Sequence, residues 1–289
     1  MLAGLFASVA VAAPPPSAAP VPVPRAAPVV LYAPDARTVP FRPRLTAPAY
    51  VALDADTGQV LVTRRERARL PIASLTKIMT GLLVAESGDL DRKAVVPPAA
   101  PLVEPNRDDL RAGRRYRRET LLWGTMLASA NDSALTLAVD EGRGSARRFY
   151  ARMNARAEEL GMRDTVYASA NGLDDVRNAS TALDQALLLT AALRNRTFAR
   201  VVRTVRHRVP WARPVVVKEY VNHNRMLTSY PGVYGGKTGW TTIAGGCLAV
   251  AAERDGRRVV AVVLRSRNIW SDMPRLLDAA FAASVPKGG

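Results

Sequence analysis

The stretch Ala73-Ser74-Leu75-Thr76-Lys77-Ile78-Met79-Thr80 opens the first strongly periodic segment of the chain, residues 72–86. Apolar residues recur there at the spacing of a buried helix, namely Leu75, Ile78, Met79, Leu82 and Leu83. Gly88 follows where a helix C-cap is expected. Residues three apart share one face of a helix. The sequence therefore predicts that the Ser74 hydroxyl and the Lys77 amine lie within reach of each other.

This serine–lysine pair can carry nucleophilic chemistry under one condition. Lys77 accepts the Ser74 proton only when it is neutral, so burial or a nearby cation must lower its pKa from the free value of about 10.4. The Ser74 amide, near a helix N-terminus, can donate to a developing oxyanion. Taken alone, however, Ser-x-x-Lys is a common pattern, and an N-cap followed by a surface lysine is the simpler interpretation.

A second polar element, Ser129-Ala130-Asn131, lies at the junction of two predicted helices, residues 120–130 and residues 133–140. A serine hydroxyl at such a junction can relay a proton to a leaving amine. An asparagine amide can hold both a lysine and a substrate carbonyl. Helix capping is again the simpler interpretation of this element by itself.

The third element is Lys237-Thr238-Gly239, which precedes Trp240. A lysine and a hydroxyl on an edge strand can bind a carboxylate, and Gly239 leaves room for a substrate strand alongside. A turn with an incidental lysine is the alternative. Lysine is scarce in this arginine-rich chain, yet Lys77 and Lys237 both fall within these elements. A compact ammonium that can become neutral meets a demand that arginine does not.

Together and in this order, the three elements resemble the active-site serine penicillin-binding proteins and the class A β-lactamases. The longer strings 73–80, 128–132 and 236–241 resemble the D-alanyl-D-alanine carboxypeptidases, the low-molecular-mass penicillin-binding proteins, in particular. Segments 169–173 and 222–227 also fall where that family has similar sequences. The resemblance covers the chain from about residue 50 to its end.

The resemblance implies an α/β fold of the α+β type, β-lactamase/transpeptidase-like, with a mainly antiparallel sheet between helical layers. It also implies removal of the terminal D-alanine from peptidoglycan stem peptides and covalent inhibition by β-lactam antibiotics. We expect no cofactor. The implied roles are Ser74 as acylated nucleophile, Lys77 as its base, Ser129 and Asn131 as relay and substrate clamp, Lys237 and Thr238 as carboxylate binders, and the amides of Ser74 and Trp240 as oxyanion hole.

The order of predicted elements agrees with this fold. Residues 51–54 and 59–62 flank a tight-turn signal and predict a β-hairpin. Further helices are predicted at 145–160, 182–194 and 272–283, and further strands at 246–252 and 258–264. Strands at both ends enclosing a helical middle predict terminal strands paired in one sheet, with helices on its faces.

The N-terminal region predicts that the protein is located outside the cytoplasm. Residues 1–13 are apolar and end in small residues, as in a signal-peptide remnant, although the positive n-region is missing and a disordered Ala-rich terminus is the alternative. Residues 14–48 are rich in proline and alanine and are interpreted as a linker. Residues 49–289 form the predicted catalytic domain. We expect a bacterial protein that is secreted or attached to the envelope.

Composition narrows the partners. The formal net charge of +16 arises mostly from scattered arginine and favours contact with polyanions, which could be nucleic acid, acidic lipid headgroups or anionic wall polymers. We expect electrostatic contact with wall polymers or lipid and not with nucleic acid. The chain carries no recognisable nucleic-acid-binding signature. One cysteine, Cys247, and two histidines, His207 and His223, are too few for a structural zinc site. We expect Cys247 to be a buried core residue and both histidines to have structural or surface roles.

Three rival functions remain open to different degrees. A β-lactamase is disfavoured because Ser129-Ala130-Asn131 departs from the Ser-Asp-Asn pattern of class A and no loop glutamate is evident. A peptidoglycan DD-endopeptidase with the same site, or a non-catalytic wall-binding or penicillin-sensing protein, stays possible.

One departure from the family concerns the substrate carboxylate. Some members bind it with an arginine well beyond the third element, where this chain has Asp272, and Arg265, Arg267 and Arg275 are candidate replacements.

Overall fold

The structure is a computed structural model that describes residues 43–173, 177–211 and 216–283. Its strands are β1 (Ala49–Asp54), β2 (Val60–Arg64), β3 (Leu70–Pro71), β4 (Lys93–Val95), β5 (Arg115–Arg117), β6 (Ala179–Ser180), β7 (Arg206–Trp211), β8 (Val216–Val221), β9 (Val233–Thr241), β10 (Gly245–Arg254) and β11 (Arg257–Ser266). Its helices are α1 (Thr76–Glu86), α2 (Arg118–Trp123), α3 (Asn131–Glu141), α4 (Ala146–Glu159), α5 (Ala182–Ala192), α6 (Arg196–Arg203), α7 (Met226–Ser229) and α8 (Ile269–Ala282).

The principal sheet joins the two ends of the domain. Its strand order is β2-β1-β11-β10-β9, and every neighbouring pair is antiparallel. Val51 of β1 faces Val262 of β11 in the register. The predicted hairpin is confirmed as β1 and β2, with Gly58 at φ +75° in its turn. The predicted pairing of terminal strands is therefore confirmed, and β9 is the edge strand.

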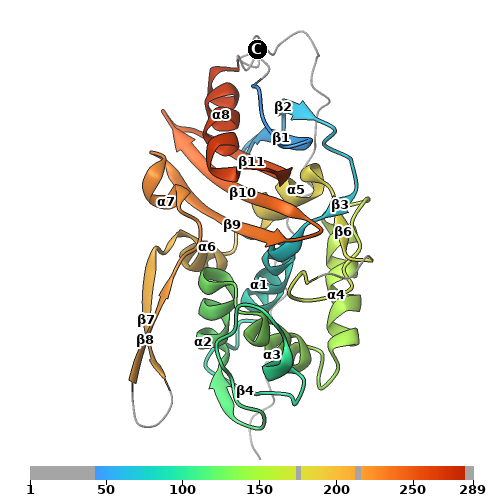
Figure 1. The fold of residues 1–289 in the computed structure, drawn as a ribbon, viewed down its shortest axis with the longest axis vertical. Helices are drawn as coiled ribbons and strands as arrows, with labels where there is room; N and C mark the ends of the chain where they lie inside the picture. The colour runs from blue at the N-terminus through green and yellow to red at the C-terminus, as the bar shows by residue number, and fades with distance from the viewer. Residues whose placement is uncertain (1–42, 174–176, 212–215, 284–289) are drawn as a thin grey trace, which may run out of the picture.

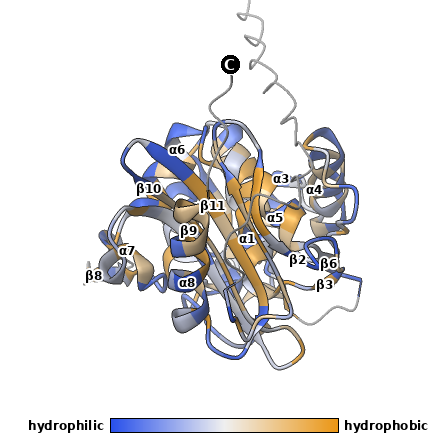
Figure 2. Cartoon of the chain, turned by 90° about the horizontal axis from the view of Figure 1, so that it is seen from above, coloured by the Kyte–Doolittle hydropathy of each residue, from blue (hydrophilic) through white to orange (hydrophobic). Residues whose placement is uncertain are grey.

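Helices cover both faces of this sheet, as Figure 1 shows. Helix α8 packs on one face against β10 and β11, whereas α5 packs on the other against β11, β1 and β10. Each face has its own cluster of buried apolar side chains. Figure 2 shows the hydrophobic colouring concentrated on the central strands β10 and β11. Burial of apolar side chains on both faces thus anchors the sheet that carries β9.

The helical middle departs from the prediction in its details. The segment predicted as one helix over 120–130 is α2 followed by a π-helical turn, Gly124–Ala128. The pairs β4–β5 and β7–β8 lie within the middle that the sequence indicated as helical. Strands β7 and β8 form a hairpin that projects from the body in Figure 1. Helix α8 begins at Ile269, before the predicted start at residue 272.

The described part begins inside the segment interpreted as a linker. The predicted signal-peptide remnant, residues 1–13, and residues 14–42 of the linker lie outside the described residues. Ala47 is already buried against the α8 face of the sheet, and Thr46 is hydrogen-bonded to α8. The packed domain thus starts before residue 49. Within the described ranges, none of the helices has both the length and the apolar character that crossing a bilayer requires.

Candidate active site

The start of α1 and strand β9 meet at Ser74. Ser74 lies in a single 3-10 turn, Ala73–Leu75, directly before α1, and Ala73 adopts the left-handed region with φ +47°. A Cβ on Gly239 would lie 2.9 Å from the Ser74 nitrogen and 3.1 Å from the Ile72 oxygen. Only glycine lets β9 approach this turn so closely without displacement. The chain therefore places the Lys-Thr-Gly strand against the candidate nucleophile.

Lys77 is the centre of the polar contacts. Its Nζ donates to Ser74 Oγ at 2.9 Å, to Asn131 Oδ1 at 2.7 Å and to the Asn171 carbonyl at 2.7 Å. All three ammonium protons therefore have acceptors although the side chain is fully buried. Burial, assisted by the charge of Lys237, holds the pKa of Lys77 well below its ordinary value. A lysine with these properties can be neutral and accept the Ser74 proton.

Ser129 and Asn131 reach the same place through an irregular helix end. The π-helical turn Gly124–Ala128 ends at Ser129, which adopts the left-handed region with φ +59°. The Asn131 side chain accepts from Lys77 and donates to the Pro105 carbonyl, while the Asn131 amide donates to the Asn106 carbonyl at 2.8 Å. Single π-turns occur frequently at functional sites. Here the turn places Asn131 within hydrogen-bonding distance of Lys77 and Ser129 within hydrogen-bonding distance of Lys237.

Lys237 is a second buried lysine, contributed by β9. Its Nζ donates to Ser129 Oγ at 3.0 Å and to the Thr238 carbonyl at 3.0 Å. Burial lowers the pKa of Lys237 to about 7. Near neutral pH it can therefore carry the charge that a substrate carboxylate requires, and a bound carboxylate would raise its pKa again.

These residues border a pocket of about 870 Å³. Six of the eight predicted site residues line it: Ser74, Ser129, Asn131, Thr238, Gly239 and Trp240. Lys77 and Lys237 lie buried beside it and contact its lining through Ser74 and Ser129. Trp240 is 69% exposed at this pocket. The structure thus brings all eight predicted residues together.

The pocket also contains residues that the sequence did not assign to it. Arg225 and Trp270 both line it, with the guanidinium 5.5 Å from the indole centroid. His223 lines it too, a position at the site that the sequence did not indicate. Burial and the charges of Lys237 and Lys77 lower the pKa of His223. His207, in contrast, stacks on Trp123 with ring centroids 3.7 Å apart.

The candidate carboxylate-binding arginines separate clearly. Arg267 lines the pocket. Arg275 instead donates to the Arg44 carbonyl at 3.3 Å. Arg265 is left-handed, with φ +57°, and is not among the lining residues. Asp272 is fully buried and accepts hydrogen bonds from Thr46 and Ser266.

The remaining reactive side chains have ordinary surroundings. Cys247 is fully buried in β10, as expected, and burial raises the pKa of its thiol to about 12. Across the part of the chain that the structure describes, no cluster of three or more His, Cys, Asp or Glu side chains is arranged to hold a metal ion.

An antiparallel sheet with helices on both faces, carrying a Ser-Lys pair beside Ser129, Asn131 and a Lys-Thr-Gly strand, defines an active-site serine peptidase of the penicillin-binding class. Sequence comparison is more specific. The D-alanyl-D-alanine carboxypeptidase family, Peptidase_S11, matches residues 36–268, and the chain belongs to this family. The predicted family and fold class are confirmed.

Individual relatives agree with this family. D-alanyl-D-alanine carboxypeptidase DacB2 of Mycobacterium tuberculosis is 33% identical, over 82% of this chain and 82% of the relative. DacF of Bacillus subtilis is 32% identical over 82% of this chain, which spans 62% of the length of that relative. A crystal structure of a Mycobacterium tuberculosis D-alanyl-D-alanine carboxypeptidase matches with a TM-score of 0.80 and 34% identity, covering 87% of this chain and 96% of that one. A Pseudomonas aeruginosa D-alanyl-D-alanine endopeptidase is 30% identical over 78% of this chain.

Proposed function

We propose that this protein is a serine-type D-Ala-D-Ala carboxypeptidase that removes the terminal D-alanine from peptidoglycan stem peptides through an acyl-enzyme on Ser74. The observation that carries the proposal is the buried Lys77 amine, 2.9 Å from Ser74 Oγ and held on its other sides by Asn131 and Asn171. Membership of the family supports peptidoglycan peptides as substrates and β-lactams as ligands.

Acylation uses the lysine pair in opposite protonation states. Neutral Lys77 takes the hydroxyl proton as Ser74 Oγ bonds to the carbonyl carbon of the penultimate D-alanine. Lys237, charged, and Thr238 hold the terminal carboxylate of the substrate. The amides of Ser74 and Trp240 donate to the oxyanion that forms on the carbonyl oxygen.

Cleavage and deacylation return the protons. The peptide C–N bond breaks, and the leaving D-alanine nitrogen receives the proton from Lys77 by relay through the Ser129 hydroxyl. Water then attacks the Ser74 ester, and its proton passes to Lys77 and back to Ser74 Oγ. The products are free D-alanine and a stem peptide shortened by one residue.

The charge around the pocket supports a carboxylate-bearing substrate. Arg225 and Arg267 line the pocket, and Lys237 lies buried beside it. Opposite charge at short range favours acidic ligands, more so where water is partly excluded. Some family members bind the substrate carboxylate with an arginine at the place of Asp272. In this chain Arg267, which lines the pocket, is the candidate for that contact.

The direct test is release of D-alanine from a peptide ending in D-Ala-D-Ala. We expect release by the wild type, none by Ser74→Ala, and wild-type release by Ser87→Ala. Ser87 is a suitable control because it follows α1, its hydroxyl donates to the Val84 carbonyl and accepts from Arg118, and none of these three residues lines the pocket. Release that persists in Ser74→Ala would contradict the proposed nucleophile.

An endopeptidase with the same site is the second candidate, supported by the relative that carries that name. It predicts cleavage of cross-linked stem dimers with little D-alanine release from the pentapeptide. A non-catalytic penicillin-sensing protein predicts stable labelling of Ser74 by a fluorescent penicillin with turnover of neither substrate.

The location and the electrostatic partners are part of the same proposal. Peptidoglycan lies outside the cytoplasmic membrane, so the substrate requires an extracytoplasmic protein, which agrees with the apolar N-terminal residues 1–13. The formal net charge of +16 supports attraction to anionic wall polymers or acidic lipid headgroups.

A further inference from the structure

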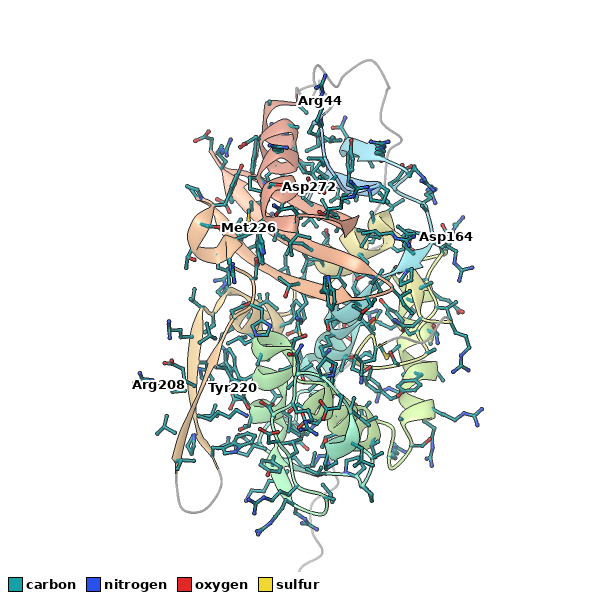
Figure 3. The ribbon with its side chains drawn as sticks, in the orientation of Figure 1. Arg44, Asp164, Arg208, Tyr220, Met226 and Asp272 are labelled. Carbon is teal, nitrogen blue, oxygen red and sulfur yellow. The ribbon has the colours of Figure 1, made fainter. Side chains whose placement is uncertain are left out.

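The segment that leads into the first strand is held by one buried carboxylate. Asp272 lies in the first turn of α8 and is fully buried. Its Oδ1 accepts from the Thr46 amide at 2.9 Å, and its Oδ2 accepts from the Thr46 hydroxyl at 2.7 Å and from the Ala47 amide at 2.9 Å. Figure 3 labels Asp272 on α8 and Arg44 on the incoming chain. Three donors thus attach residues 46–47 to a single acidic side chain.

Thr46 also contacts the turn that follows β11. Its hydroxyl oxygen accepts from the Arg267 amide at 3.0 Å and from the Asn268 amide at 3.4 Å. It lies 3.2 Å from Ser266 Oγ, which itself donates to Asp272 Oδ2 at 2.6 Å. One hydroxyl therefore links the backbone of this turn to the buried carboxylate.

The same turn is part of the pocket wall. Ser266, Arg267 and Asn268 all line the pocket that contains Ser74. Strand β10 connects this part of the wall to β9, because Gly246 of β10 pairs with Trp240 of β9 on one side and with Ser266 of β11 on the other. A Cβ on Gly246 would lie 2.8 Å from the Ser266 oxygen, so turn and strand are in direct contact. A shift of the turn would therefore move one boundary of the substrate site.

We propose that Thr46, together with Asp272, is a positioning residue for substrate binding. Thr46 fixes the turn Ser266–Asn268 and thereby the position of Arg267 in the pocket wall. This inference rests on the proposed function and deepens it, because the part of the pocket wall that Thr46 fixes, Ser266–Asn268, is a part that binds the acidic peptide substrate. In this chain the acidic residue at position 272 supports the wall from behind and does not contact the substrate.

The test compares Thr46→Val, which keeps the shape but removes the hydroxyl, with Thr46→Ser, which keeps the hydroxyl. Thr46 is exposed, and in Thr46→Val the buried Asp272 carboxylate keeps the Thr46 and Ala47 amides and the Ser266 hydroxyl as donors, so we expect both variants to fold. With the D-Ala-D-Ala peptide we expect Thr46→Val to raise KM about fivefold while kcat changes less than about twofold, as loss of hydrogen bonds that only position the substrate would do. Thr46→Ser should restore the wild-type KM.

A matched control exists elsewhere in the fold. Thr165 Oγ1 donates to Asp184 Oδ2, also at 2.7 Å, and contacts Ser180 Oγ at 2.6 Å. Asp184 lies in the first turn of α5, and none of these residues lines the pocket. Thr165→Val should lower thermal stability and leave KM unchanged. Equal KM changes in Thr46→Val and Thr165→Val would reduce Thr46 to a general structural role and overturn the proposal.

A second readout separates this inference from the proposed activity. Hydrogen exchange at the Arg267 and Asn268 amides, both donors to Thr46, should accelerate in Thr46→Val and stay unchanged in Thr165→Val. Unchanged exchange in Thr46→Val overturns the positioning role even if the enzyme is active. If exchange is faster in Thr46→Val but the wild type releases no D-alanine, the proposed function is rejected, while the coupling between Thr46 and the turn is retained.

Discussion

At the residue scale, catalysis requires Lys77 to be neutral while Lys237 is charged. Burial lowers both pKa values, that of Lys237 to about 7. We predict that kcat/KM for the D-Ala-D-Ala peptide falls above about pH 7 to 8, because free Lys237 then loses the proton that binds the carboxylate, and falls at acid pH, because Lys77 gains one. A pH profile measures both limbs.

An amide analogue of the peptide isolates the role of Lys237. Without a terminal carboxylate, binding no longer needs a charged Lys237, so the alkaline limb should disappear while the acid limb of Lys77 remains. An alkaline limb that is identical for acid and amide substrates would assign it to another group, and His223, a titratable side chain that lines the same pocket, would be examined first.

The residues of the site were predicted to different extents. Helical spacing predicted that Ser74 and Lys77 lie close together, and the scarcity of lysine drew attention to Lys237. That Lys237 and Ser129 meet this pair in one site was implied by the resemblance alone. The Asn171 carbonyl, third acceptor of Lys77, is a backbone group with no side-chain signature. His223 was missed because a single histidine in a loop has no periodicity that would indicate which way it points.

At the element scale, the close approach of β9 to the turn before α1 makes a prediction about Gly239. Gly239→Ala places a methyl group 2.9 Å from the Ser74 nitrogen, so strand and turn must separate. We expect the rate of acylation of Ser74 by a fluorescent penicillin to fall about 10- to 100-fold, since small displacements of reacting groups are costly.

Gly235 provides the control on the same strand. A Cβ there would meet the side chains of Val202 at 3.1 Å and Leu193 at 3.3 Å, away from Ser74. Gly235→Ala should cost about 1–3 kcal/mol of stability by overpacking. Its acylation rate, measured on folded protein, should stay within about twofold of wild type, and a comparable loss in both variants would exclude a local effect of Gly239.

Elements with strong periodicity were predicted, and those shaped by tertiary contacts were not. Short apolar runs predicted strands β10 and β11, and apolar residues at helical spacing predicted helices α1 and α5. Strand β7 reads Arg-His-Arg-Val-Pro-Trp, which has few apolar residues and a proline that disfavours strand interiors. The π-helical turn before Ser129 is also invisible in the sequence, because its apolar residues fit a regular helix equally well.

At the scale of the whole molecule, the strand-helix-strand order was sufficient to predict one sheet built from both ends of the domain. It did not predict that residues 46–47 belong to that unit. The proline and alanine around residues 46–47 indicate a linker. These two residues are nevertheless held against the domain by hydrogen bonds to Asp272, more than two hundred residues away in the sequence. Long-range polar contacts of this kind leave no local pattern.

The net charge of the whole molecule leads to the last prediction. Attraction between a +16 protein and an anionic polymer is long-range and screened, with a Debye length of about 10 Å at 0.1 M salt. On wall fragments that carry anionic polymers, raising NaCl from about 50 to about 300 mM should lower the rate of D-alanine release several-fold. On a soluble peptide, or on walls stripped of those polymers, the same change should alter the rate less than about twofold, because only short-range contacts in the pocket remain. Equal salt sensitivity on all three substrates would show that the positive charge acts within the pocket and does not recruit the enzyme to the wall.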